Sequence, residues 1–421
     1  MSPTELGLVQ SIYTLGGLVG ALLAGPSATK YGRLFTMRAT TIVFIFGPLA
    51  EALAPHVGVM IVGRFLSGIG AGASTVVCPI YISEVAPVSK RGFFGAFTQV
   101  MTNVGILMAQ LLGYFLSRDS LWRIILGAAG ILGAIEFLGL LITPETPKWL
   151  SEHRQANRAR RILQLIRGSH INIDEEVKEW NHPPEHDEEE SLLGPRASEA
   201  TPRKPHVGII QVVKSPETRT AVIGVVAVMV AQQLTGINSI IMYSVNILET
   251  VLPTSAALLT VIVSAVNVFV TLACSPLADK IGRKWCLLLS ISGMGCGSVL
   301  LAIALNSNIR ILAGISTLLF VASFAVGLGP VPFILASELV GPEAVGATQS
   351  WALAANWIAT FIVAQFFPIL KDAMGGRGRV YWVFAALALI LGSFIAWWVP
   401  ETKGKANADE VWGRNQHRRV D

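Results

Sequence analysis

The stretch ATKYGRLFTMR at residues 28–38 returns 250 residues later as ADKIGRKWCLL at residues 278–288. Two further signatures repeat at nearly the same interval, 254 and 256 residues: Ser83-Glu84 with Ser337-Glu338, and Pro144-Glu145-Thr146 with Pro400-Glu401-Thr402. Long apolar stretches separate the signatures, so each unit is a set of membrane helices whose charged ends carry the repeats. The chain is therefore a duplicated membrane-embedded unit, an organisation typical of secondary transporters.

The composition fits a chain whose outer surface faces lipid. Of the 421 residues, 52% are hydrophobic and only 14% are charged, and the mean hydropathy is +0.58. A soluble globule of this composition would have too little polar surface. The formal net charge is +5, but the basic residues gather in alternate links between apolar stretches, which is a topology signal. We therefore expect a lipid bilayer around the chain and no nucleic-acid partner.

A helix needs about 20 apolar residues to cross a bilayer, and by this criterion the sequence predicts eleven spans. They lie at residues 6–28, 36–54, 57–82, 93–116, 121–143, 219–247, 255–278, 285–305, 310–337, 345–370 and 380–399. Links rich in Lys and Arg alternate with links poor in them, which places the rich links and the C-terminus in the cytosol. The sequence predicts an all-α membrane protein with a five-span bundle (1–143), a cytosolic segment (144–218), a six-span bundle (219–400) and a cytosolic tail (401–421).

The segment between the two bundles has two parts. Apolar and basic residues alternate at helical spacing from Pro147 to Arg167, which predicts an amphipathic helix against the membrane face. Residues 181–205 hold five prolines, an acidic run and few apolar side chains, which is typical of a disordered linker.

Within this linker an acidic residue precedes a Leu-Leu pair: Glu188, Leu192 and Leu193. The pattern resembles the acidic dileucine signal that sorting adaptors read on proteins bound for vacuoles or lysosomes. The alternative is a solvated charge run, with the plasma membrane as the location.

Nine short motifs follow one another along the chain. They are Gly32-Arg33, RFLSGIG (64–70), PIYISEVAP with Arg91-Gly92 (79–92), PETPKW (144–149), QQLTGIN (232–238), DKIGRK (279–284), GPVP (329–332), Asn356-Trp357 and PETKG (400–404). Together they resemble the sugar porters of the major facilitator superfamily over nearly the whole chain. The resemblance implies two bundles of six transmembrane helices, of which the first helix is missing here, so that this chain is expected to hold five plus six.

Two predicted spans contain helix-breaking residues at corresponding positions of the second bundle. Gly236 separates Gln233 from Asn238, which a continuous helix would place about 140° apart. The span at 310–337 contains Gly327, Gly329, Pro330 and Pro332. Paired interruptions of this kind mark transport sites. Amide side chains nearby suit a neutral polyol, because they offer donors and acceptors to hydroxyl groups without a charge.

The resemblance to sugar porters implies a set of substrate-binding residues. They are Gln110, Gln232, Gln233, Asn238, Asn356 and Trp357, with Phe333 where the family usually has tryptophan. An apolar ring still stacks on a sugar face, but it lacks the indole N–H. The alternative role for these amides is to hold helices together.

Charged residues at the ends of the spans are candidates for gating ion pairs. They are Arg33, Glu84, Arg91 and Glu145 in one bundle, and Asp279, Arg283, Glu338 and Glu401 in the other. Opposite charges at helix ends can pair in one conformation and separate in the next; the alternative is that they only set topology. Thr29 replaces an acid common in the family and Val345 replaces an arginine, so both gates are expected to be weak.

Proton coupling is left open by the sequence. By resemblance, Arg64 matches an arginine that proton-driven relatives pair with an acid on their first helix, and an arginine inside a span needs a partner. We therefore expect transport of a hexose-like monosaccharide by alternating access, as a uniporter or a proton symporter. The alternatives are a truncated inactive product of a transporter gene and a non-transporting sugar sensor.

No nucleophile–base pair or cluster of metal-ligating residues occurs in the sequence, so we expect no enzyme, no metal site and no cofactor.

Overall fold

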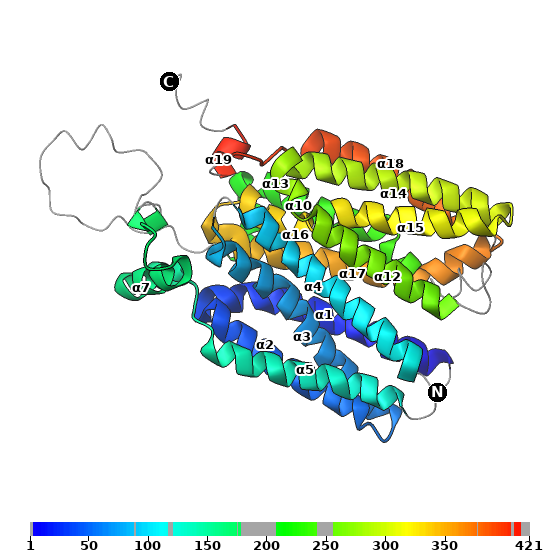
Figure 1. The fold of residues 1–421 in the computed structure, drawn as a ribbon, viewed down its shortest axis with the longest axis horizontal. Coiled ribbons are helices and arrows are strands. Elements are labelled where there is room, and N and C mark those ends of the chain that lie inside the picture. Colours follow the sequence, from blue (N-terminus) through cyan, green and yellow to red (C-terminus); the bar gives the residue numbers. More distant parts are fainter. Residues whose placement is uncertain are drawn as a thin grey trace, which may run out of the picture.

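The structure is a computed structural model. It describes residues 3–87, 90–116, 121–174, 176–177, 208–241, 256–376, 378–405 and 408–413, and these ranges contain helices but no strand. The long helices run side by side along the longest axis of the molecule (Figure 1). One end of this axis carries the short helices α7 and α19, and we call it the α7 end; the opposite end is the far end.

The first half consists of five long helices: α1 (Pro3–Tyr31), α2 (Arg33–Ala52), α3 (Val57–Val85), α4 (Arg91–Leu116) and α5 (Trp122–Ile142). They match the five predicted spans to within a few residues at most ends. α1 packs closely on α3, where a Cβ atom added at Gly72 would collide with the backbone of Gly17. Glycine therefore permits this close helix crossing.

The second half carries more and shorter helices, in the order α9 (Ile209–Lys214), α10 (Pro216–Leu234), α12 (Ala256–Cys274), α13 (Leu277–Ile281), α14 (Arg283–Asn306), α15 (Arg310–Val326), α16 (Pro332–Leu339), α17 (Val345–Ala373), α18 (Val380–Trp398) and α19 (Ala408–Val411). The predicted span at 310–337 is thus two helices, α15 and α16. Pro332 begins α16 because proline fits the first turn of a helix, where no backbone donor is needed.

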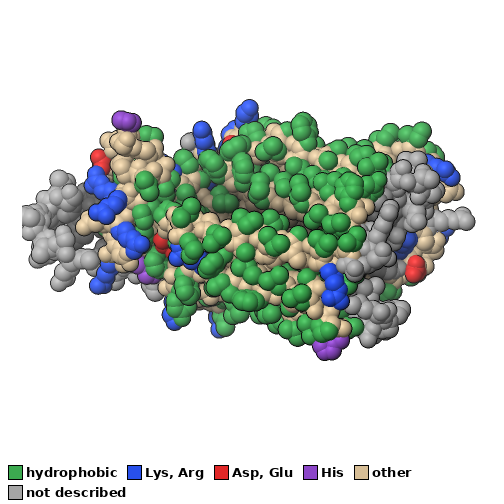
Figure 2. All heavy atoms as spheres, turned by 60° about the horizontal axis from the view of Figure 1, so that its bottom comes forward, with side chains coloured by type: hydrophobic (Ala, Val, Ile, Leu, Met, Phe, Trp, Pro, Cys, Tyr) green, Lys and Arg blue, Asp and Glu red, His purple; other side chains and the backbone are tan. Residues whose placement is uncertain are grey.

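Nine helices in the described ranges are long and apolar enough to cross a membrane, and two shorter apolar helices, Leu258–Cys274 and Arg310–Val326, lie in the two remaining predicted spans. Figure 2 shows hydrophobic side chains over the middle of the molecule and most Lys and Arg side chains toward its ends. Large apolar side chains are also exposed at the ends of helices, for example Ile142 (88%) and Trp397 (77%). The distribution is that of a protein embedded in lipid.

Two pairs of long helices make most of the contacts between the halves. α1 packs against α17, and α4 packs against α12. Because each pair contains one helix from each half, any relative movement of the halves must change these contacts.

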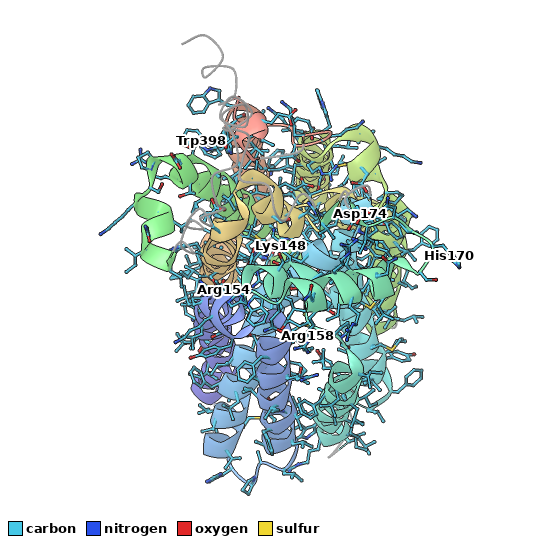
Figure 3. All side chains as sticks on the ribbon, turned by 90° about the vertical axis from the view of Figure 1, so that its left-hand side faces the viewer. Lys148, Arg154, Arg158, His170, Asp174 and Trp398 are labelled. Atoms are coloured by element: carbon cyan, nitrogen blue, oxygen red, sulfur yellow. The ribbon has the colours of Figure 1, made fainter. Side chains whose placement is uncertain are left out.

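The predicted amphipathic helix is two helices at the α7 end, α6 (Pro147–Glu152) and α7 (Ala156–Arg167). Figure 3 looks onto this end and shows Lys148, Arg154 and Arg158 along the segment. α7 buries Ala159 and Leu163, and α6 is tied to α1 by the indole N–H of Trp149, which donates to the carbonyl of Thr29 at 2.9 Å. The acidic linker at 181–205 and the dileucine residues Glu188, Leu192 and Leu193 lie outside the described residues.

Candidate transport site

The two interrupted helices meet inside the second half. After α10, Gly236 takes a φ of +96°, which glycine adopts without strain. Residues 327–331 separate α15 from α16. The buried carbonyl of Leu328 in this gap accepts a 2.6 Å hydrogen bond from Nε2 of Gln232. The gap between α15 and α16 therefore supplies a hydrogen-bond acceptor for Gln232, the amide next to the break at Gly236.

Four of the predicted substrate-binding amides form one chain of hydrogen bonds. Oε1 of Gln232 accepts from Nδ2 of Asn356 at 2.7 Å, and Oδ1 of Asn356 accepts from Nε2 of Gln233 at 3.2 Å. The chain ends at Asn238, whose Nδ2 donates to Oε1 of Gln233 at 2.6 Å. This last contact depends on the break at Gly236, because a continuous helix would hold the two side chains on different faces. We call these four residues the amide chain.

The two ends of the amide chain differ in whether their hydrogen-bonding groups are free to bind a ligand. Gln232 and Asn356 direct their N–H groups to backbone carbonyls, that of Asn356 to Met229 at 3.0 Å, and both side chains are buried. Asn238 is half-buried, and no described residue donates to its Oδ1 atom. An acceptor therefore stays open at the Asn238 end.

Two aromatic side chains accompany the amides. Phe333 lies at the start of α16 and is 9% exposed. Trp357 on α17 lies against α1, where Gly17 leaves room for the indole and Tyr13 meets it edge to face with ring centroids 5.9 Å apart. The indole Nε1 atom is buried and has no hydrogen-bond partner among the described residues, so Trp357 offers a donor.

Gln110 does not join the amide chain. Its Oε1 atom accepts a 2.5 Å hydrogen bond from Ser264, across the contact between α4 and α12. Further polar side chains line the same contact: Nδ2 of Asn103 donates to Oδ1 of Asn267 at 3.1 Å and to Oγ1 of Thr271 at 2.8 Å, and Gln99 donates to Asn103 at 2.9 Å. We call Gln99, Asn103, Asn267 and Thr271 the polar seam.

The polar seam was not predicted. Its residues lie four apart on α4 and four apart on α12, so helical spacing of amide and hydroxyl groups was the available signal.

The first of the two predicted gating clusters forms around Arg33 at the α7 end. Arg33 forms a 2.6 Å ion pair with Glu84 of α3, and both side chains are 6% exposed. Glu84 also accepts from the Thr146 hydroxyl at 2.8 Å, while Glu145 accepts from the backbone N–H groups of Arg33 and Leu34 at 3.0–3.2 Å. Burial raises the pKa of the Glu145 carboxyl above its ordinary value, although hydrogen bonds from the backbone N–H groups of Thr146 and Leu34 and the charge of Arg33 oppose the rise.

The second half repeats this cluster. Arg283 pairs with Glu338 at 2.7 Å, Thr402 donates to Glu338 at 2.5 Å, and Glu401 accepts from the backbone N–H of Arg283 at 2.8 Å. The turns before the two arginines are alike, with φ of +101° at Gly32 and +105° at Gly282. In both turns a carboxylate fills the space where a Cβ atom would stand. The duplication seen in the sequence is therefore also a duplication of side-chain contacts.

Contacts between the halves at this end are not symmetric. Oδ2 of Asp279, in the second half, accepts from the backbone N–H of Phe93 in the first half at 3.0 Å. The equivalent residue of the first half is Thr29, whose hydroxyl lies next to Gly346 at the start of α17. A charge-assisted hydrogen bond on one side thus corresponds to van der Waals contact on the other. The Nε atom of Arg91 has no hydrogen-bond partner in the described part of the chain.

Arg64 has an acidic partner on a neighbouring helix. Its Nε atom lies 3.2 Å from Oε2 of Glu51 on α2, and the Glu51 side chain is 2% exposed. Glu51 was not among the predicted site residues, because its position at the end of a span is equally typical of a solvated helix end. Among the described residues, no group of three or more His, Cys, Asp or Glu side chains could hold a metal ion.

Comparison with known proteins agrees with this architecture. The sequence profile of the family described as "Sugar (and other) transporter" matches residues 2–411. The chain is 33% identical to the probable metabolite transport protein YBR241C of Saccharomyces cerevisiae over 98% of this chain and 83% of that protein. It is 31% identical to vacuolar protein sorting-associated protein 73 of the same yeast (96% and 82%), and 32% identical to the glucose transporter GlcP of Staphylococcus epidermidis (96% and 88%).

Solved structures show the same fold. The proton:xylose symporter XylE bound to 6-bromo-6-deoxy-D-glucose superimposes with a TM-score of 0.82 at 25% identity, over 97% of this chain and 89% of XylE. The inward-open conformation of XylE from E. coli gives 0.71 at 26% identity and the same coverage. The structure is therefore more similar to the sugar-bound form than to the inward-open form.

Proteins of this kind are carriers rather than enzymes, and the matches run through both halves and the segment between them. The chain belongs to the sugar transporter family of the major facilitator superfamily.

Proposed function

We propose that this chain carries a neutral monosaccharide across a membrane by alternating access. The amide chain is the observation that supports this most directly, since four uncharged amides meet at two helix breaks. With the open acceptor of Asn238, the free indole N–H of Trp357 and the ring of Phe333, the site offers an acceptor, a donor and an apolar face. A pyranose has hydroxyl groups and an apolar ring face that match this set.

Within this proposal, Gln233 and Asn238 contact the sugar, and Gln232 and Asn356 hold them in position. Gln232 and Asn356 each donate to a backbone carbonyl, whereas the hydrogen bonds of Gln233 are to other amide side chains, which can rearrange around a sugar. Gln110 would contact the sugar only when its bond to Ser264 opens. D-Glucose and D-xylose are the first sugars to test, because the names of GlcP and XylE specify glucose and xylose.

The conformational cycle follows from the duplicated clusters. In this structure the clusters around Arg33 and Arg283 are formed and Asp279 bonds across the halves, so the α7 end is closed. We propose that this end faces the cytosol, because positive charge in its loops favours that orientation. We further propose that it opens when these contacts separate. The division into bundles at 1–143 and 219–400 is part of the same proposal.

The membrane is either that of the vacuole or lysosome or the plasma membrane. The likeness to a yeast protein named for vacuolar sorting supports the former, with Glu188, Leu192 and Leu193 as the sorting signal for an adaptor. Uniport and proton symport are both compatible with the fold.

The test is uptake by the purified chain in liposomes, measured as exchange of radiolabelled D-glucose or D-xylose against unlabelled sugar. Gln233→Ala should reduce exchange at least about tenfold, because one or two hydrogen bonds to the sugar are lost. Gln211→Ala is the matched control, since Gln211 is exposed on α9 and remote in sequence from both helix breaks.

Unchanged exchange in a well-folded Gln233→Ala protein would exclude this residue from the site. If the wild-type protein binds either sugar, measured by protection against thermal unfolding, but never exchanges it, the chain is a sensor rather than a transporter.

A further inference from the structure

We propose that Glu51 is the proton-binding carboxyl of this transporter, and that Arg64 and Tyr13 relay its charge state to the sugar site. The inference rests on the proposed sugar transport and adds a second substrate, the proton. It depends on four features: burial of the carboxyl, a matched pair of partners, a pocket made by small residues, and a link to Trp357.

The Glu51 carboxyl is held by one hydroxyl and one cation. The Ser67 hydroxyl donates to Oε1 at 2.5 Å, and Nε of Arg64 lies 3.2 Å from Oε2. The Arg64 contact is an ion pair without the geometry of a hydrogen bond. The Glu51 side chain is 2% exposed and that of Arg64 is 35% exposed, so the arginine connects the buried acid to the surroundings.

Small residues shape the pocket around the acid. A Cβ atom at Gly63 would collide with Cγ of Glu51, and one at Gly47 would collide with Ser67. The side chain thus lies in a space that only glycine at these two positions leaves open. Because Ser67 can accept as well as donate a hydrogen bond, the pocket can satisfy both the carboxylate and the carboxylic acid.

Among the described residues of the helices packed against α2, no second acid faces Glu51. α3 contributes Arg64 and Ser67, and α1 contributes Tyr13, which is near enough to Arg64 and Glu51 to feel both charges. From α5, the Arg123 guanidinium is engaged with the carbonyls of Ala52 and Ala54 at 3.0 and 2.9 Å. His56, in the link after α2, is exposed. Protonation of Glu51 would therefore leave the Arg64 guanidinium without its acidic partner.

Tyr13 connects this cluster to the sugar site. Its ring meets the indole of Trp357 edge to face at 5.9 Å, and Trp357 belongs to α17 in the other half. When Glu51 takes up a proton, Arg64 loses the negative charge that balances it. The electrostatic field at Tyr13 then changes, and Tyr13 lies against Trp357, a proposed sugar contact. The proton binds to a carboxylate oxygen and leaves from it, with no other bond made or broken.

Glu51 lies near the far end of the bundle, since α2 ends at Ala52 and α3 begins at Val57. Arg64 is seven residues into α3, or roughly 10 Å from its start at 1.5 Å per residue. A proton could therefore reach the pair from the side opposite the closed α7 end.

The test uses the full-length chain in liposomes with an alkaline lumen. For one proton per sugar, a gradient of one pH unit drives up to about tenfold accumulation of labelled D-glucose or D-xylose, since one unit equals about 1.36 kcal/mol. Glu51→Gln, which copies the protonated state, should abolish accumulation and the entry of protons seen by a lumenal pH dye. It should retain sugar exchange without a gradient, because exchange needs no net proton movement. Glu51→Asp should retain accumulation.

Glu136→Gln is the matched control, because Glu136 is the other acid within the predicted spans of the first half besides Glu51, and its side chain is exposed on α5. This variant should accumulate sugar like the wild type.

A second readout needs neither a mutant nor a sugar. Dicyclohexylcarbodiimide attacks protonated carboxyls in apolar surroundings, so it should modify Glu51 of the wild-type protein, and the reaction should be faster at acidic pH.

The outcomes separate the two proposals. If Glu51→Gln accumulates sugar at the wild-type level, Glu51 is not the proton site. The same conclusion follows if only Glu136→Gln loses proton-driven sugar accumulation. Sugar exchange without any proton-driven accumulation in the wild type shows a uniporter and overturns this inference, while the proposed transport stands. If the wild type exchanges neither sugar, the proposed transport fails, and absence of carbodiimide modification at Glu51 overturns the proton site independently.

Discussion

The hydrogen bond from the backbone N–H of Phe93 to Asp279 spans the two halves at the α7 end, and its loss should favour opening there. Asp279→Ala removes the acceptor and also the 3.0 Å ion pair of Asp279 with Arg283, but that ion pair lies within the second half, and Arg283 keeps its 2.7 Å ion pair with Glu338. A hydrogen bond to a charged group is worth about 1.5–3 kcal/mol. Because the Asp279 side chain is 26% exposed, solvent screening reduces this to about 1–2 kcal/mol.

This free energy is present only when the halves touch, so its loss raises the population open at the α7 end by about five- to thirtyfold. The assay is alkylation of a reporter cysteine, Ile334→Cys, in a protein whose four native cysteines are replaced by alanine. Ile334 is 3% exposed and seals α16 against Gly95 of α4, so a charged maleimide reaches the reporter only after opening. The alkylation rate should rise by the same factor in Asp279→Ala.

Asp174→Ala is the control, because it removes an acid from an exposed pair with Arg160 that does not join the halves. An alkylation rate in Asp279→Ala equal to that of the control would refute the reasoning and show that the interaction across the halves is not energetically coupled to opening.

Two further predictions concern the duplicated turns. Thr29→Asp should slow alkylation of the same reporter, because an acid next to Gly346 would accept from the start of α17 as Asp279 does from α4; a faster rate would show that the halves are not equivalent here. Gly282→Ala should lower the midpoint of thermal unfolding, since a φ of +105° costs an alanine about 1 kcal/mol or more and its methyl group meets the Glu401 carboxylate. Gly314→Ala, in the middle of α15 with open space around it, should raise the midpoint or leave it unchanged, and equal losses in both variants would contradict the strain argument.

The sequence predicted contacts best where the same charged motif occurs in both halves. Arg33 and Arg283 could be recognised as equivalent because Gly32 and Gly282 precede them and paired acids follow at matching intervals, and the structure gives them the same partners. The helix breaks at Gly236 and at residues 327–331 were equally predictable, since glycine and proline are rare inside spans without a reason.

Pairwise contacts between distant helices were not predictable. The polar seam joins Asn103 to Asn267 over 164 residues, and no local pattern fixes which faces of α4 and α12 meet. Glu51 was missed because its burial depends on glycine at positions 47 and 63, and a single sequence does not show that two helices approach at those points. The backbone partners of Gln232 and Asn356, which are the carbonyls of Leu328 and Met229, are likewise set by tertiary structure and not by a local pattern.

The amide chain has a consequence for a step in which no sugar takes part. A carrier completes its cycle by returning empty, and unpaired amides inside a low-dielectric protein would make that return slow, because each costs about 1–3 kcal/mol. Here Gln232, Gln233, Asn238 and Asn356 satisfy most of their hydrogen-bonding groups with one another and with the backbone. If the amide chain is the sugar site, as proposed, sugar binding would exchange one set of hydrogen bonds for another, which favours modest affinity and rapid release. The empty and sugar-bound carriers would then be close in free energy, and neither step of the cycle would be slowed by an overly stable state.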